Sequence, residues 1–128
     1  MAAMGLMQKR VEDEAKQFQN MQKEHSKMGQ AFSKLMAQHN ENEMVLAELK
    51  ILKDDSKVYK LVGPVLLNQD LDEAKTTVEK RLQYIGDEMK RTQNHLNDLE
   101  SRCEEKKSKI MQMQAQLRKG PAKPEVEQ

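Results

Sequence analysis

The sequence predicts a mainly α-helical fold, a long antiparallel two-helix coiled coil whose helices are joined by a single β-hairpin. Three observations support this prediction. Two heptad stretches of similar length flank one short apolar segment at residues 58–67, and Gly63-Pro64 divides that segment. The composition, with 34% charged and only 37% hydrophobic residues, suits an elongated coiled coil better than a broad globular core. Such a fold encloses no pocket, which favours binding over catalysis.

The first heptad stretch predicts a helix over about 4–53. Its seam, the row of positions that would face a partner helix, is interrupted by only four polar residues. A pattern kept over this length is a strong coiled-coil signal. The seam consists of Met4, Met7, Val11, Glu14, Phe18, Met21, His25, Met28, Phe32, Leu35, His39, Asn42, Leu46 and Leu49.

The second heptad stretch predicts a helix over about 70–119. Asp70 is the expected N-cap, and Glu73 three residues later completes a capping-box pattern. One domain over 1–120 and a disordered tail over 120–128 are therefore expected, because Gly120-Pro121 stops the helix. The second seam consists of Leu71, Lys75, Val78, Leu82, Ile85, Met89, Thr92, Leu96, Leu99, Cys103, Lys106, Ile110, Met113 and Leu117.

The matching lengths indicate that the two helices pair with each other. If the chain reverses near residue 60, Glu14 comes to lie opposite Lys106, and opposite charges in a seam help to fix its register. The same register predicts four apolar pairs, namely Leu49 with Leu71, Leu35 with Ile85, Phe32 with Met89, and Met7 with Met113.

The apolar segment predicts a β-hairpin over about 57–68, preceded by a turn at Asp54-Asp55-Ser56. Its strands are expected at 58–62 and 65–67, because Gly63 can supply the positive φ of a tight turn and Pro64 fixes the next residue. An isolated hairpin is marginal in water and exposes two unpaired edges. This hairpin is therefore expected to join strands of other subunits in a shared sheet or intersubunit β-barrel.

The two chain ends meet in the antiparallel register and form one tip, rich in methionine. Methionine is flexible and polarizable, and it suits surfaces that accept many partners. For Met7 and Met113, packing between the two helices is the better interpretation. For Leu6 and Met111, which lie off the seam, binding of a partner is at least as good an interpretation as packing. The apolar residues of the tip are Met1, Met4, Leu6, Met7, Ile110, Met111, Met113 and Leu117.

Several classes of protein are disfavoured. Net charge is +1 with the two signs interspersed, which argues against nucleic acid as the main ligand. No secretory signal or membrane-length apolar stretch is present, so a cytoplasmic protein without membrane contact is expected. No phosphate loop, paired-cysteine zinc spacing or nucleophile elbow occurs, so we expect no enzyme activity, cofactor or metal. His25 and His95 approach one another in the register, but two ligands are too few for a structural zinc site.

The hairpin segment between two heptad helices resembles the β-type subunits of prefoldin. The residues that carry the resemblance are Val58-Tyr59-Lys60-Leu61-Val62-Gly63-Pro64-Val65-Leu66, followed by Leu71, Glu73-Ala74, Val78, Lys80-Arg81-Leu82 and Tyr84-Ile85. It covers almost the whole chain and weakens only after Gly120. The coiled coil alone is nonspecific, whereas the tyrosine-containing strand followed by Gly63-Pro64 is quite specific.

The resemblance implies a heterohexamer of two α-type and four β-type subunits, whose hairpins form β-barrels and whose coiled coils project from them. It also implies capture of unfolded polypeptides such as actin and tubulin, and transfer to the cytosolic chaperonin without ATP. The location it implies is the cytoplasm, with a second location in the nucleus left open. By position, it assigns subunit assembly to Val58, Tyr59, Leu61, Val62, Gly63, Pro64, Val65 and Leu66. It assigns client contact to Met4, Leu6, Met7, Ile110, Met111, Met113 and Leu117. The alternative is a structural coiled-coil subunit of a tethering or cytoskeletal complex, which would not need the hairpin.

Overall fold

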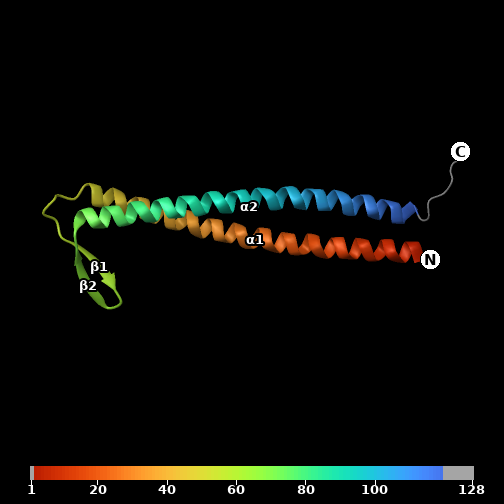
Figure 1. Cartoon of the computed structure of the whole chain (residues 1–128), viewed down its shortest axis with the longest axis horizontal. Helices are drawn as coiled ribbons and strands as arrows, with labels where there is room; N and C mark the ends of the chain where they lie inside the picture. The colour runs from red at the N-terminus through yellow and green to blue at the C-terminus, as the bar shows by residue number, and fades with distance from the viewer. Residues whose placement is uncertain (1, 120–128) are drawn as a thin grey trace. The chain divides into compact units, whose positions relative to one another are not determined.

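The computed structural model describes residues 2–119 and contains two long helices with a β-hairpin between them (Figure 1). The elements are α1 (Ala2–Lys50), β1 (Val58–Val62), β2 (Val65–Gln69) and α2 (Leu71–Lys119). Each helix has 49 residues. The predicted fold, two matched helices joined by one hairpin, is confirmed.

The chain divides into two compact units. Over the described residues, the terminal unit consists of 2–29 and 94–119, and the hairpin unit consists of Gln30–Gln93. Each unit therefore contains one segment of each helix, and the hairpin belongs to the second. The predicted disordered tail at 120–128 lies outside the described residues.

The heptad seams are the buried faces of both helices. Every predicted seam position is at least partly buried, including the polar ones. Leu99, in the terminal unit, is 1% exposed. Burial of a leucine side chain contributes about 1.5–3 kcal/mol. Because the buried apolar side chains of both helices lie along the seams, the seams supply most of the hydrophobic stabilisation of the helices. The 3.5-residue spacing thus identified every buried core residue except Ala74, which lies beside the seam.

The hairpin unit has a small core where the helices approach the hairpin. Leu49 of α1 packs with Leu71, Ala74 and Val78 of α2, which confirms the predicted pairing of Leu49 with Leu71. Val58, the first residue of β1, packs against this cluster, as do Leu46 and Leu82. One end of the hairpin is therefore attached to the helices by apolar contacts.

The hairpin is closed by a two-residue turn. Val62 pairs with Val65, and the antiparallel register continues to Val58 paired with Gln69. Gly63 adopts a φ of 59°. The proline that follows has its φ locked at a negative value, and this order of signs is that of a type II′ turn, which matches the twist of two antiparallel strands. Pairing extends one residue further along β2 than the expected hairpin boundary at 68.

Helix α1 ends at Lys50, earlier than the expected boundary at 53. The N–H of Leu52 bonds back to the carbonyl of Leu49 at 3.3 Å, so the chain tightens into a turn there. Leu49 is the last seam residue and already packs against Leu71, the first residue of α2, so a longer helix would find no partner surface. The expected turn at Asp54-Asp55-Ser56 is present, with the Ser56 N–H donating to the Lys53 carbonyl at 2.9 Å.

Asp70 caps α2 as the sequence predicts. Its Oδ2 accepts a hydrogen bond from the Glu73 N–H at 3.2 Å, and its carbonyl accepts from the Ala74 N–H at 2.9 Å. Asp72 and Glu73 also place negative charge in the first turn, which the helix dipole favours.

Replacing Asp70 with alanine should remove this cap and destabilise the chain by about 1 kcal/mol. Urea unfolding of the full-length chain, followed by circular dichroism, measures the loss. The control is Glu79→Ala at an exposed position inside the same helix, which should change stability by less than about 0.5 kcal/mol. Equal stability of Asp70→Ala and the control would contradict a capping role.

Candidate binding surfaces

The hairpin exposes apolar side chains on both of its faces. Strand alternation and the register place Val62, Val65 and Leu67 on one face, which also carries Val58. Tyr59, Leu61 and Leu66 lie on the other face, where Leu61 is 68% and Leu66 is 64% exposed. Val62, Val65 and Leu67 are also exposed, each by about half. Ordinary surface strands are apolar on one face only, so both faces of this hairpin are suited to burial by a partner.

The edges of the hairpin are open as well. Within residues 2–119 the sheet contains only β1 and β2, so each strand has one edge without a neighbour. Open edges beside apolar side chains favour pairing with further strands. The residues predicted for assembly lie together on this one element, and their role in assembly remains a prediction.

The predicted tip residues lie at the free ends of α1 and α2 within the terminal unit. Figure 1 shows the first turns of α1 beside the last turns of α2. The seam members are half-buried, which fits the packing role preferred for Met7 and Met113. Leu6 is 67% and Met111 is 59% exposed, as expected for positions off the seam. Met1 lies outside the described residues. The half-buried tip residues are Met4, Met7, Ile110, Met113 and Leu117.

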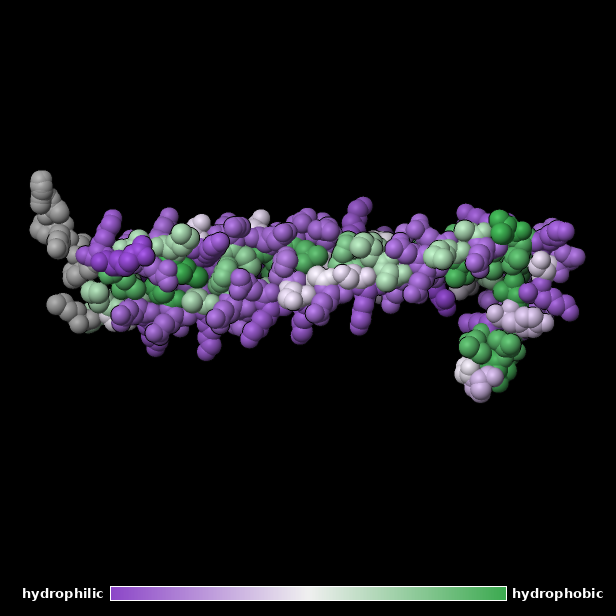
Figure 2. Space-filling model, turned by 180° about the vertical axis from the view of Figure 1, so that it is seen from behind, coloured by the Kyte–Doolittle hydropathy of each residue, from purple (hydrophilic) through white to green (hydrophobic). Residues whose placement is uncertain are grey.

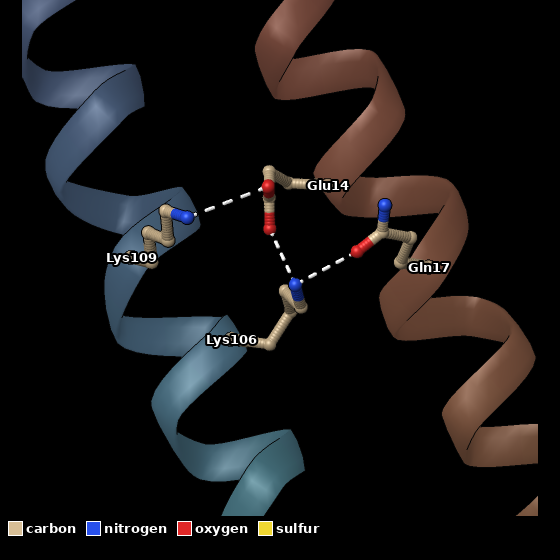
Figure 3. A network of polar contacts seen from close by, with 4 residues as sticks. All are labelled: Glu14, Gln17, Lys106 and Lys109. Atoms are coloured by element: carbon tan, nitrogen blue, oxygen red, sulfur yellow. Dashed lines mark hydrogen bonds and ion pairs between the residues drawn. The ribbon is translucent and has the colours of Figure 1, made fainter.

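An interhelical polar network lies in the seam of the terminal unit (Figure 3). The Lys106 Nζ donates to Glu14 Oε1 at 2.6 Å and to Gln17 Oε1 at 2.8 Å, and Lys109 lies 3.5 Å from Glu14. The Glu14 and Lys106 side chains are only 18% and 20% exposed. The pairing of Glu14 with Lys106 is confirmed, and it selects one register because a shifted register would leave both charges half-buried without partners.

The network also changes the acidity of Glu14. The hydrogen bond from Lys106, together with the positive charges of Lys106 and Lys109, lowers the pKa of Glu14 below its ordinary value of 4.5. A carboxylate whose pKa falls on folding stabilises the fold above its unfolded pKa, and this contribution is lost as the pH falls through the folded pKa.

We therefore expect Glu14→Gln to destabilise the chain at neutral pH and to cost progressively less as the pH falls below about 4.5. Thermal unfolding of the full-length chain at a series of pH values, for wild type and variant, gives the difference directly. Glu12→Gln, at an exposed position on the same helix, is the matched control. A stability difference for Glu14→Gln that does not depend on pH would contradict the ion pair.

A second interhelical contact lies in the same unit. His95 Nε2 is 2.8 Å from Glu24 Oε2. The predicted register places His95 near His25, the residue that follows Glu24. His25 lines a shallow groove with Phe18 and the half-buried Cys103. Over the part of the chain that the structure describes, no group of three or more His, Cys, Asp or Glu side chains could hold a metal ion. No described helix is long and apolar enough to cross a membrane.

Sequence reasoning missed four exposed apolar residues near the end of α1. Met44 and Val45 near the end of α1, with Ile51 and Leu52 in the turn that follows, are all exposed. The signal was present in the sequence, because Met44 and Ile51, like Val45 and Leu52, are seven residues apart. These positions lie off the seam, so a search along the seam passes over them.

Comparison with known proteins shows one family. A family model described as "Prefoldin subunit" matches residues 12–117. Prefoldin subunit 6 of Mus musculus is 42% identical over 117 residues, which cover 91% of this chain and 92% of the mouse protein. Prefoldin subunit 6 of Arabidopsis thaliana is 42% identical over 111 residues, which cover 87% of this chain and 86% of the plant protein.

A solved structure has the same fold. The crystal structure of the prefoldin beta subunit from Thermococcus strain KS-1 aligns with a TM-score of 0.75 and covers 80% of this chain and 90% of that chain. Sequence identity is 20%, so this likeness shows the fold alone.

Proposed function

Because the chain belongs to the prefoldin subunit family, we propose that it is a β-type subunit of a heterohexameric, ATP-independent chaperone. In this proposal the hairpin assembles with other α- and β-type subunits. The tip captures unfolded polypeptides, such as actin and tubulin chains, for transfer to the cytosolic chaperonin. Action in the cytoplasm, without a cofactor, belongs to the same proposal.

The observation that carries this proposal is the hairpin itself. It exposes six large apolar side chains over two faces and leaves both strand edges open. Such an element is marginal alone in water and exposes a surface prone to aggregation, whereas strands from other subunits would pair its edges and cover its side chains. A coiled-coil tether, the alternative function, has no use for it.

The tip supports capture by weak contacts. Leu6 and Met111 expose flexible apolar side chains beside half-buried seam residues. An apolar side chain contributes roughly 1.5–3 kcal/mol when fully buried and less at a partial contact, so one tip binds an unfolded chain weakly. Several tips on one body gain affinity through effective concentration when the client spans them. Weak individual contacts also allow release without nucleotide hydrolysis.

Purification of the native complex through this chain tests the proposal. Native mass spectrometry should give a heterohexamer whose other chains are also coiled-coil chains that carry hairpins. A homodimer, or an assembly with filament proteins, would support the tethering alternative and contradict the chaperone function.

A further inference from the structure

The tip carries charge of one sign. Residues 2–11 and 106–119 contain seven basic residues and no acidic residue, although the whole chain has a net charge of only +1. Two of the seven, Lys106 and Lys109, bond to Glu14 in the polar network. The other five are exposed, and within residues 2–119 none of them pairs with a carboxylate. These five cations are Lys9, Arg10, Lys107, Arg118 and Lys119.

The polar network shows that the cations of both helices lie at the same end of the terminal unit. Glu14 of α1 is 2.6 Å from Lys106 and 3.5 Å from Lys109 of α2. The helices run antiparallel, so the residues before Glu14 lie beside the residues after Lys106 (Figure 1). In Figure 2, hydrophobic and hydrophilic side chains lie next to one another at this end, beside the grey residues. The cations therefore share the tip with the exposed side chains of Leu6 and Met111.

Each of these two apolar side chains has cations on its own helix face. Lys9 and Arg10 follow Leu6 by three and four residues, the spacing of surface neighbours on a helix. Lys107 precedes Met111 by four residues, and Arg118 follows it two turns further along the same face. An apolar contact flanked by positive charge is thus present on both helices of the tip.

Helix stability explains only some of these cations. Arg118 and Lys119 lie in the last turn of α2, where the helix dipole favours positive charge. The dipole gives Lys9 and Arg10 no such advantage, because they lie near the N-terminal end of α1, whose first turn contains no acidic residue either. The ligand whose charge complements this end is an anion from outside the chain, held beside an apolar group.

We propose that the tip selects client segments in which carboxylates lie next to apolar side chains. This inference rests on the proposed capture of unfolded polypeptides and specifies which segments are preferred. The apolar side chains of such a segment contact Leu6 and Met111, and its Asp or Glu side chains lie near the flanking cations. Exposed ion pairs are weak, so they set a preference among clients that the apolar contacts hold. The two tip segments contain no aromatic residue on which bases could stack, which favours a polypeptide over a nucleic acid.

Binding of two short unstructured peptides to the assembled wild-type complex tests this preference. The peptides carry leucines at the same positions and differ only in having aspartate or asparagine between them. Fluorescence anisotropy should show that the aspartate peptide binds about tenfold more tightly, because several weak ion pairs act together. Added salt should remove most of this difference. Equal affinities would overturn the inference and leave the proposed capture intact, whereas failure of both peptides to bind would contradict the proposed capture itself.

A charge-removing variant locates the preference on the molecule. Lys9→Gln with Arg10→Gln should reduce the ratio of the two affinities about threefold. The matched control is Lys80→Gln with Arg81→Gln, an exposed Lys-Arg pair near the start of α2 in the hairpin unit, which should keep the full ratio. An equal reduction in both variants would overturn the tip as the source of the preference. Binding of vesicles rich in phosphatidylserine, with no preference between the peptides, would overturn it in favour of a membrane surface.

Discussion

Aspartate at both Val62 and Val65 is expected to abolish assembly while leaving the helices largely intact. The two residues are paired across the turn and lie on one face of the hairpin. Burying a carboxylate without a partner costs several kcal/mol, and two at adjacent positions in a shared sheet also repel each other. The helices form their seam without either residue, so helicity should change little.

Native mass spectrometry and circular dichroism of the co-expressed subunits separate the two effects. The variant chain should appear as a helical species that does not enter the heterohexamer. The matched control is Lys57→Asp, which adds a carboxylate just before β1 at an exposed position outside the strands. Survival of the complex in the double variant would refute the hairpin as the assembly element, and loss in the control would show that any added charge prevents assembly.

Much of the fold could be predicted because coiled-coil burial follows directly from spacing. Positions three and four apart lie on one side of a helix, so the half-buried state of even Glu14 and His39 follows from their place in the heptads. The register followed from the matched helix lengths and a reversal near residue 60, which bring Glu14 opposite Lys106, and the structure contains that ion pair. The turn followed from Gly63, whose positive φ other residues avoid.

The remaining features depend on three-dimensional context. The apolar pattern continues past Lys50, and only the packing of Leu49 against Leu71 shows why α1 ends there. Gln17 joins the network of Glu14 and Lys106 through a long side chain whose reach no spacing rule describes. The off-seam position of Ile51 is visible in the sequence, but its place in a turn beyond the helix emerges only because α1 ends at Lys50. At the tip, the heptad spacing distinguishes exposed residues from packed ones. It does not predict which exposed residues contact a client, because that depends on the client as well.

Serine at both Leu6 and Met111 is expected to raise about tenfold the amount of complex needed to suppress aggregation of a denatured client such as actin. Both side chains are more than half exposed, so their loss removes contact surface without disturbing the seam. Weakening one tip lowers the affinity of the whole complex, because the contributions of linked tips multiply. The complex should keep the same number of subunits. The substitutions lie in the terminal unit, whereas the hairpin that is proposed to carry assembly lies in the hairpin unit.

The control for the tip variant is Tyr84→Ser, an equally exposed apolar residue in the hairpin unit. Light scattering of the diluted client at a series of complex concentrations gives the comparison. Equal suppression by the tip variant and wild type would remove Leu6 and Met111 from the client surface. Equal weakening by Tyr84→Ser would mean that clients bind exposed apolar residues anywhere on the coiled coil. Weakening confined to the tip variant, with the hexamer intact, would separate capture from assembly, because the two activities would then reside at different elements of one chain.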